Sequence, residues 1–152
     1  MIRWQWCDLS ELSTRQLYAL FAAREAVFVV EQTCPYQELD GLDLEARHLI
    51  GWSDDAVAAY LRVLAPGVKF AETALGRVLT TTDFRGTGIG RELMQRALDY
   101  TDMQYAAHGV RISAQAHLQR FYGSFGFTAV SQQYLEDGIT HIEMLRAVRT
   151  GR

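Results

Sequence analysis

The chain is poor in several residue types that would direct it toward specialised classes of protein. It has only two prolines and two cysteines among 152 residues, so neither a proline-rich linker nor a disulfide framework is indicated. An excess of one charge is also lacking, because 15 Lys and Arg against 18 Asp and Glu give a net charge of −3. That balance does not provide the electrostatic footprint of a nucleic-acid-binding protein.

Long apolar runs are missing as well. No stretch approaches the length of a membrane span, and Met1–Trp6 lacks the continuous apolar segment of a signal peptide. We therefore expect a cytoplasmic protein without membrane association, in which Cys7 and Cys34 stay as free thiols. With 49% hydrophobic and 22% charged residues, the composition is globular, and one domain over residues 1–152 is expected.

Strand-like and helical patterns alternate along the chain. A capping box at Ser13–Gln16 opens a helix whose apolar spacing persists to about Phe28–Glu31. The following segment, Thr33–Glu45, has no periodicity and is predicted to be a loop. The other expected elements are a strand at Ile2–Cys7, a hairpin of Arg47–Trp52 and Ala56–Leu64, a strand at Leu75–Thr82, a helix ending near Ala107, a strand at Val110–Ala114, a short helix at His117–Ser124, and closing strands at Phe127–Val130 and Ile139–Arg146. This order predicts a mixed α/β (α+β) fold around one sheet.

The most informative segment is the glycine-rich run Arg85–Arg91, which reads RGTGIGR. It lies between a β-branched run, Arg77–Thr82, and an amphipathic helical pattern that begins near Leu93. Glycines let the backbone approach a ligand closely, and the free N–H groups and dipole of a helix N-terminus favour an anion. The segment therefore predicts a phosphate-binding loop, with a glycine-rich turn that binds no ligand as the alternative.

The spacing of this loop separates it from the two commonest phosphate motifs. A Walker A loop needs Gly-Lys-Ser/Thr, whereas Gly90 is followed by Arg and Glu. A dinucleotide fingerprint needs Gly-x-Gly-x-x-Gly, whereas these glycines occupy every second position. A nucleotide-binding regulator is therefore disfavoured. Arg85, Gly88 and Gly90 instead form Arg-x-x-Gly-x-Gly, which resembles the [Gln/Arg]-x-x-Gly-x-[Gly/Ala] pyrophosphate loop of GNAT-type N-acetyltransferases.

A second segment resembles the same superfamily. Ala116–Phe127 ends in Phe-Tyr-x-x-x-Gly-Phe, like the GNAT segment whose tyrosine often lies beside the coenzyme A sulfur. Val27–Glu38, Asp40–Asp43, Arg47–His48 and Asp137–Ile142 are similar to the bacterial ElaA-type group, so the resemblance covers essentially the whole chain. It implies the GNAT acyl-CoA N-acyltransferase fold: a mixed, mostly antiparallel sheet of six to seven strands flanked by helices. Its two central strands would run parallel and splay to admit the cofactor.

The resemblance also implies a reaction and residues to carry it. It indicates an acetyl-CoA-dependent N-acetyltransferase that transfers an acetyl group directly to a primary amine of a small molecule or peptide. Tyr122 would be the general acid that protonates the departing thiolate, the alternative being a packed core tyrosine. The expected cofactor-binding residues are Val78, Leu79 and Thr80 along the pantetheine arm and Arg85, Gly86, Thr87, Gly88, Ile89, Gly90 and Arg91 at the pyrophosphate. No metal is expected.

The general base and the acceptor are less defined. Many GNAT enzymes carry a glutamate on the strand before the phosphate loop, but Arg77–Thr82 has no carboxylate. Glu31, His48 and His141 are candidates for the base, and each histidine has a satisfied structural role as its alternative. The residues expected around the acceptor are Phe28, Glu31, Gln32 and His48.

The loop after the first helix is acidic. Five carboxylates fall within fifteen residues, close to Tyr36: Glu31, Glu38, Asp40, Asp43 and Glu45. Carboxylates beside an aromatic ring suit a cationic amine, and an ordinary solvated acidic loop is the alternative. A non-catalytic acyl-CoA binding or sensing module is the second functional hypothesis. The sequence does not fix the oligomeric state, so a homodimer stays open.

Overall fold

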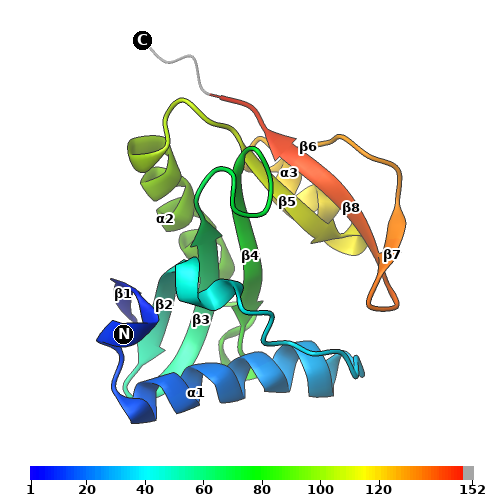
Figure 1. Ribbon diagram of the computed structural model, residues 1–152. Helices are drawn as coiled ribbons and strands as arrows, with labels where there is room; N and C mark the ends of the chain where they lie inside the picture. The colour runs from blue at the N-terminus through cyan, green and yellow to red at the C-terminus, as the bar shows by residue number, and fades with distance from the viewer. Residues whose placement is uncertain (149–152) are drawn as a thin grey trace.

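The computed structural model describes residues 1–148, which form one sheet with helices on both faces (Figure 1). The strands are β1 (Arg3–Cys7), β2 (Arg47–Ser53), β3 (Ala56–Leu64), β4 (Thr73–Thr80), β5 (Val110–Gln115), β6 (Thr128–Ala129), β7 (Tyr134–Glu136) and β8 (Ile139–Arg146). The helices are α1 (Thr14–Glu25), α2 (Ile89–Gln104) and α3 (Gln119–Gly123), a π-helix η2 (Ala26–Glu31), and the 3₁₀ turns η1 (Leu9–Glu11), η3 (Leu42–Glu45), η4 (Thr82–Phe84) and η5 (Ala116–Leu118). In this part of the chain no helix is long and apolar enough to cross a membrane.

The strands follow the order β1-β2-β3-β4-β5-β8-β6, and β7 pairs with β8 beyond that path. Among the described strands only β4 and β5 pair in parallel, whereas all the other neighbouring strands pair antiparallel. The predicted mixed α/β fold is therefore confirmed. Residues 1–148 contain eight strands rather than six or seven, because the short strands β6 and β7 both pair with β8. The sequence analysis missed β7, whose three residues are too few for a clear alternating pattern.

The first helix begins as predicted and ends differently. The Ser13 hydroxyl accepts from the Gln16 N–H at 3.1 Å, and the Gln16 side chain accepts from the Ser13 N–H at 2.9 Å, so the capping box is confirmed. The α-helix ends at Glu25, and the chain continues as the π-helix η2 to Glu31. A π-turn widens the helix and turns its side chains to new directions, and such turns occur frequently at functional sites.

The core has two apolar layers because neighbouring strand residues point to opposite faces of the sheet. On β2, Leu49 packs in the layer that α2 covers and Ile50 in the layer that α1 covers with Leu20. The buried residues of α2 are the predicted apolar stripe together with Ile89: Leu93, Met94, Ala97, Leu98 and Thr101. The two helices therefore hold opposite faces of β2, β3 and β4.

The central strands separate after a short parallel contact. Thr73 pairs with Val110 and Ala74 pairs with Arg111, and the pairing of β4 with β5 ends there. Figure 1 shows the two strands diverging from that end. The predicted splay is thus confirmed, although β4 begins and ends two residues before the predicted strand. On its other side β4 pairs with β3 through an irregular register, and Arg77 has a φ of 52°.

Candidate functional site

The glycine-rich segment forms an open turn at the start of α2. Gly86 has a φ of 78° and Gly88, the N-cap of α2, has a φ of 85°, which is the left-handed region that favours glycine. A Cβ at either position would meet nothing within 4 Å, so space lies open beside the backbone. No side chain caps α2, which leaves its first-turn N–H groups available to an anion.

A groove runs from this turn along β4 to α3. Its lining residues, called the loop groove below, are Val78, Leu79, Thr80, Arg85, Gly86, Gly88, Ile89, Gly90, Arg91, Leu118, Phe121 and Tyr122. The structure therefore brings together nine of the ten residues expected to bind the cofactor. Thr87 is the exception, because its hydroxyl donates to the Phe84 carbonyl at 2.6 Å and shapes the turn instead.

The two arginines of the loop have different surroundings. Arg85 forms an ion pair with Glu31 at 2.8 Å and donates to the Thr80 carbonyl at 3.1 Å. Arg91 lies 5.5 Å from the Phe125 ring centroid and donates to the Ser124 hydroxyl at 3.4 Å, and it has no carboxylate partner among residues 1–148. Arg91 is thus the loop cation left free for a ligand, whereas the Arg85 pair occupies Glu31. Glu31, expected beside the acceptor, lies at the loop and is absent from the lining of the pocket described next.

A second pocket, called the splay pocket, lies where β4 and β5 diverge. It is closed by η2, the loop after it, β5 and the β7–β8 hairpin. Phe28 and Gln32, two of the residues expected around the acceptor, line this pocket. Val78, Leu118 and Tyr122 line both the splay pocket and the loop groove. The two cavities therefore meet at these three side chains.

Tyr122 is well packed at this junction. It is 6% exposed, and its ring makes edge contacts with Phe121 at 5.2 Å and Phe127 at 6.1 Å between centroids. Burial raises the pKa of Tyr122 to about 12, because removal from water disfavours the phenolate. The hydroxyl therefore keeps its proton at neutral pH and is available as a donor.

His48, expected near the acceptor, lines neither the loop groove nor the splay pocket. It is fully buried, and its Nε2 lies 2.9 Å from the Asp43 carbonyl oxygen while its Nδ1 lies 2.6 Å from the Tyr60 hydroxyl. Because a carbonyl can only accept, Nε2 carries the proton and Nδ1 accepts from Tyr60. Burial holds the pKa of His48 below its usual value. The imidazole is a neutral support for η3.

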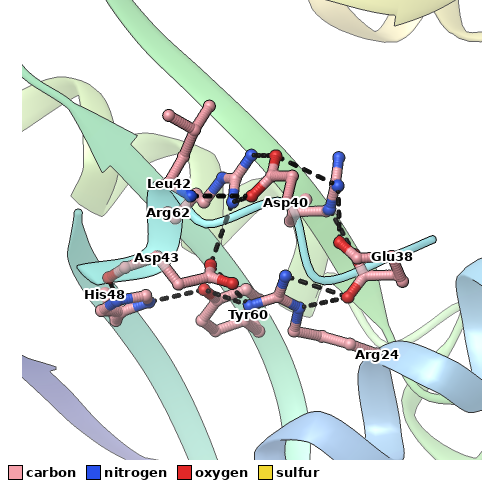
Figure 2. A network of polar contacts seen from close by, with 9 residues as sticks. Arg24, Glu38, Asp40, Leu42, Asp43, His48, Tyr60 and Arg62 are labelled. Atoms are coloured by element: carbon pink, nitrogen blue, oxygen red, sulfur yellow. Dashed lines mark hydrogen bonds and ion pairs between the residues drawn. The ribbon is translucent and has the colours of Figure 1, made fainter. Parts of the chain in front are cut away.

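The carboxylates of the acidic loop have partners within the chain. Three of its carboxylates join three arginines in a network (Figure 2): Glu38, Asp40 and Asp43 with Arg24, Arg62 and Arg77. Asp43 lies at its centre, 2.7 Å from Arg24 and 3.0 Å from Arg62. The charges of these carboxylates are compensated by arginines within the chain, so these three are not free to bind the cationic amine suggested by the sequence. They hold the loop against β3 and β4, where it walls the splay pocket.

The network keeps its carboxylates ionised. The hydrogen bond from Arg62 holds the pKa of Asp40 far below its usual range. Burial alone would raise the pKa of Asp43, but the hydrogen bonds and charges of Arg24 and Arg62 outweigh it and lower that pKa. In the part of the chain that the structure describes, no group of three or more His, Cys, Asp or Glu side chains is placed to hold a metal ion.

Comparison with known proteins agrees with this geometry. Residues 11–147 match the acetyltransferase (GNAT) domain family. Protein ElaA of Escherichia coli strain K12 is 47% identical over 150 residues, covering 97% of this chain and 98% of that protein. The crystal structure of Escherichia coli ElaA aligns with a TM-score of 0.89 over 96% of this chain and 99% of that chain. An acyl-CoA N-acyltransferase from Pseudomonas aeruginosa is 46% identical, with a TM-score of 0.91 over 97% of this chain and 100% of that chain.

The chain therefore belongs to the GNAT acetyltransferase family, whose fold supports acyl transfer from acyl-CoA. The near-full-length identity to ElaA places it in the ElaA group of that family.

Proposed function

We propose that this protein is an acetyl-CoA-dependent N-acetyltransferase that acts on a primary amine of a small molecule or peptide by direct transfer. The observation that carries the proposal is the meeting of the loop groove and the splay pocket at Tyr122. A thioester held in the groove and an amine held in the pocket would meet there without an acyl-enzyme intermediate.

The loop groove has the features that acetyl-CoA requires. Open space beside Gly86 and Gly88, the uncapped N-terminus of α2 and the Arg91 guanidinium suit a pyrophosphate. Along β4, Val78–Thr80 has no strand partner on the β5 side within residues 1–148. Backbone groups of Val78 and Leu79 on that side would pair with the amides of a pantetheine arm as a strand does, whereas the Thr80 carbonyl accepts from Arg85. A backbone N–H of this segment would polarise the thioester carbonyl.

Tyr122 would supply the proton that the departing thiolate needs. Its raised pKa keeps the phenol protonated, and a thiolate leaving group accepts that proton as the C–S bond breaks. Its buried position limits competition from bulk water.

The test is a thiol-release screen with acetyl-CoA against a panel of amines, followed by kinetics of Tyr122→Phe. Because the hydroxyl acts only in the transition state, turnover should fall by roughly 10²–10⁴ with the Michaelis constants nearly unchanged. Tyr18→Phe is the matched control, since Tyr18 is exposed on α1. Unchanged turnover in Tyr122→Phe would assign the residue to packing alone. Saturable acetyl-CoA binding without thiol release from any amine would favour the acyl-CoA binding module.

A further inference from the structure

The splay pocket contains a histidine whose protonation pattern is set by the backbone. His141 lies on β8, lines the pocket and is 8% exposed. Its Nδ1 lies 2.7 Å from the Ile139 carbonyl oxygen. A carbonyl only accepts hydrogen bonds, so Nδ1 carries the proton in the neutral ring. The Nε2 lone pair is therefore free to accept a proton.

A carboxylate faces that lone pair. Glu136 of β7 places Oε2 3.6 Å from His141 Nε2. Within residues 1–148, Glu136 pairs with no lysine or arginine, and its side chain is 46% exposed. An uncompensated carboxylate beside a proton acceptor attracts a cation and stabilises the imidazolium that forms when the cation gives up its proton.

Neighbouring groups hold this pair in place. The Tyr134 ring stacks on His141 with a centroid distance of 6.2 Å, and its hydroxyl lies 2.5 Å from the Ser113 hydroxyl of β5. The loop after η2 is joined to the β7–β8 turn by a hydrogen bond, in which the Cys34 thiol donates to the Asp137 carbonyl at 2.8 Å. Besides His141, the titratable groups lining this end of the pocket are Glu136, Asp137 and Cys34, and Tyr134 packs on the imidazole ring. The charged side chains Glu38, Lys69 and Arg77 also line the pocket.

Other candidates for a proton acceptor are occupied. Glu31 pairs with Arg85, Glu38 pairs with Arg24 and an arginine of β4, and both nitrogens of His48 have partners in the core.

We propose that Glu136 holds the acceptor as its ammonium ion and that His141 Nε2 removes the proton, so the enzyme takes cationic primary amines. This role rests on the proposed acetyl transfer. The ammonium N–H bond breaks as His141 becomes an imidazolium, and that proton later leaves to solvent. The neutral amine nitrogen then bonds to the thioester carbonyl carbon while the C–S bond breaks. The thiolate takes the Tyr122 proton, and the second proton lost by the nitrogen restores Tyr122 through solvent.

The kinetic test compares pH profiles of wild type and His141→Gln on an alkylamine found by the thiol-release screen. At pH 7 the variant should lose roughly 10²–10⁴ in turnover. The difference in turnover between wild type and variant should narrow as the pH approaches 10, because the alkylammonium ion then loses its proton to solvent without a general base. Imidazole added to His141→Ala should restore part of the rate.

Glu136→Gln should raise the Michaelis constant for the amine and leave that for acetyl-CoA unchanged. His108→Gln, at an exposed position after α2, is the matched control.

An activity-independent test reads the tautomer of His141 directly. Long-range ¹H–¹⁵N correlation spectra of the whole protein, with His141→Gln to assign the signal, should show Nδ1 protonated and Nε2 bare. The opposite tautomer would overturn the proposal. If His141→Gln kept the pH profile of the wild type, the role of His141 would be overturned, whereas the proposed acetyl transfer would still stand. Acetyl-CoA binding by calorimetry with no thiol release from any amine would overturn both.

Discussion

Arginines of the network around Asp43 and of the glycine-rich loop differ in burial and in partners. Arg24 and Arg62 of the network are at most 1% exposed, and each contacts two carboxylates. Arg91 of the loop is exposed and lies over aromatic rings, with no carboxylate partner among the described residues. The two regions use the same side chain for different purposes. Removing a guanidinium from water is costly unless a counter-charge accompanies it. The network meets that condition within the chain.

The glycine-rich loop leaves the charge of Arg91 without a carboxylate beside it. A solvated cation has little desolvation cost, so it can stay unpaired until an anionic ligand arrives. The comparison shows that the number of charges in a segment does not reveal a binding site. What distinguishes the loop is a cation with no carboxylate partner among residues 1–148, beside backbone N–H groups that no side chain caps.

The largest effect is expected at the centre of the network. Asp43→Ala leaves two buried guanidiniums without their shared carboxylate, so it should destabilise the protein by about 3–5 kcal/mol. Urea denaturation at pH 7 measures the change. Asp8→Ala is the control, because the Asp8 pair with Arg47 is exposed and is worth less than about 1 kcal/mol. Equal losses in the two variants would contradict the structural role of the network.

A smaller and different effect is expected in the loop. Arg91→Ala should weaken acetyl-CoA binding by about tenfold, or 1.4 kcal/mol, with little change in the free energy of unfolding. The loss should shrink at high salt, since exposed charges are screened. Calorimetry at two ionic strengths measures it. Arg96→Ala, one turn further along α2 and paired with Glu92, should bind as wild type does. Wild-type affinity in Arg91→Ala would place the pyrophosphate elsewhere.

The smallest effect is expected in the pH dependence of stability. The pKa of Asp40 is lowered in the folded chain by Arg62, so the unfolded chain binds more protons in acid and stability falls as the pH drops below about 4. Asp40→Asn should make that fall less steep. Urea midpoints between pH 6 and pH 3 measure the slope. Asp55→Asn, in the exposed β2–β3 turn, is the control, and an unchanged slope in Asp40→Asn would contradict the prediction.

Local sequence was sufficient where the feature itself is local. The capping box, the glycine loop and the stripe of α2 each depend on residues a few positions apart, and the structure contains all three. The parallel pairing of the two central strands was predicted from the resemblance to the GNAT family. The divergence of these strands determines where the loop groove and the splay pocket meet.

The charge network was not predicted because its members come from distant segments. Arg24 and Arg62 are 38 positions apart by residue number, and no spacing rule joins them to Asp43. A signal was nevertheless present: Arg24 occupies the apolar stripe of the first helix and Arg62 lies within an apolar strand. A charged residue on a buried face indicates a buried partner. The π-helix η2 left no comparable signal, since its residues continue the helical spacing.

The two-pair contact between β4 and β5 also has a mechanical consequence. Within residues 1–148, the pairs Thr73–Val110 and Ala74–Arg111 join the two halves of the sheet, and they lie at one end of β4. The remaining six residues of β4 act as a lever about 20 Å long. A rotation of about 5° at the joined end would move the far end by about 2 Å at that length. Because β4 is also paired with β3, a small change of packing beside Thr73 would turn the two halves of the sheet relative to each other and change the separation of β4 and β5 at their far ends.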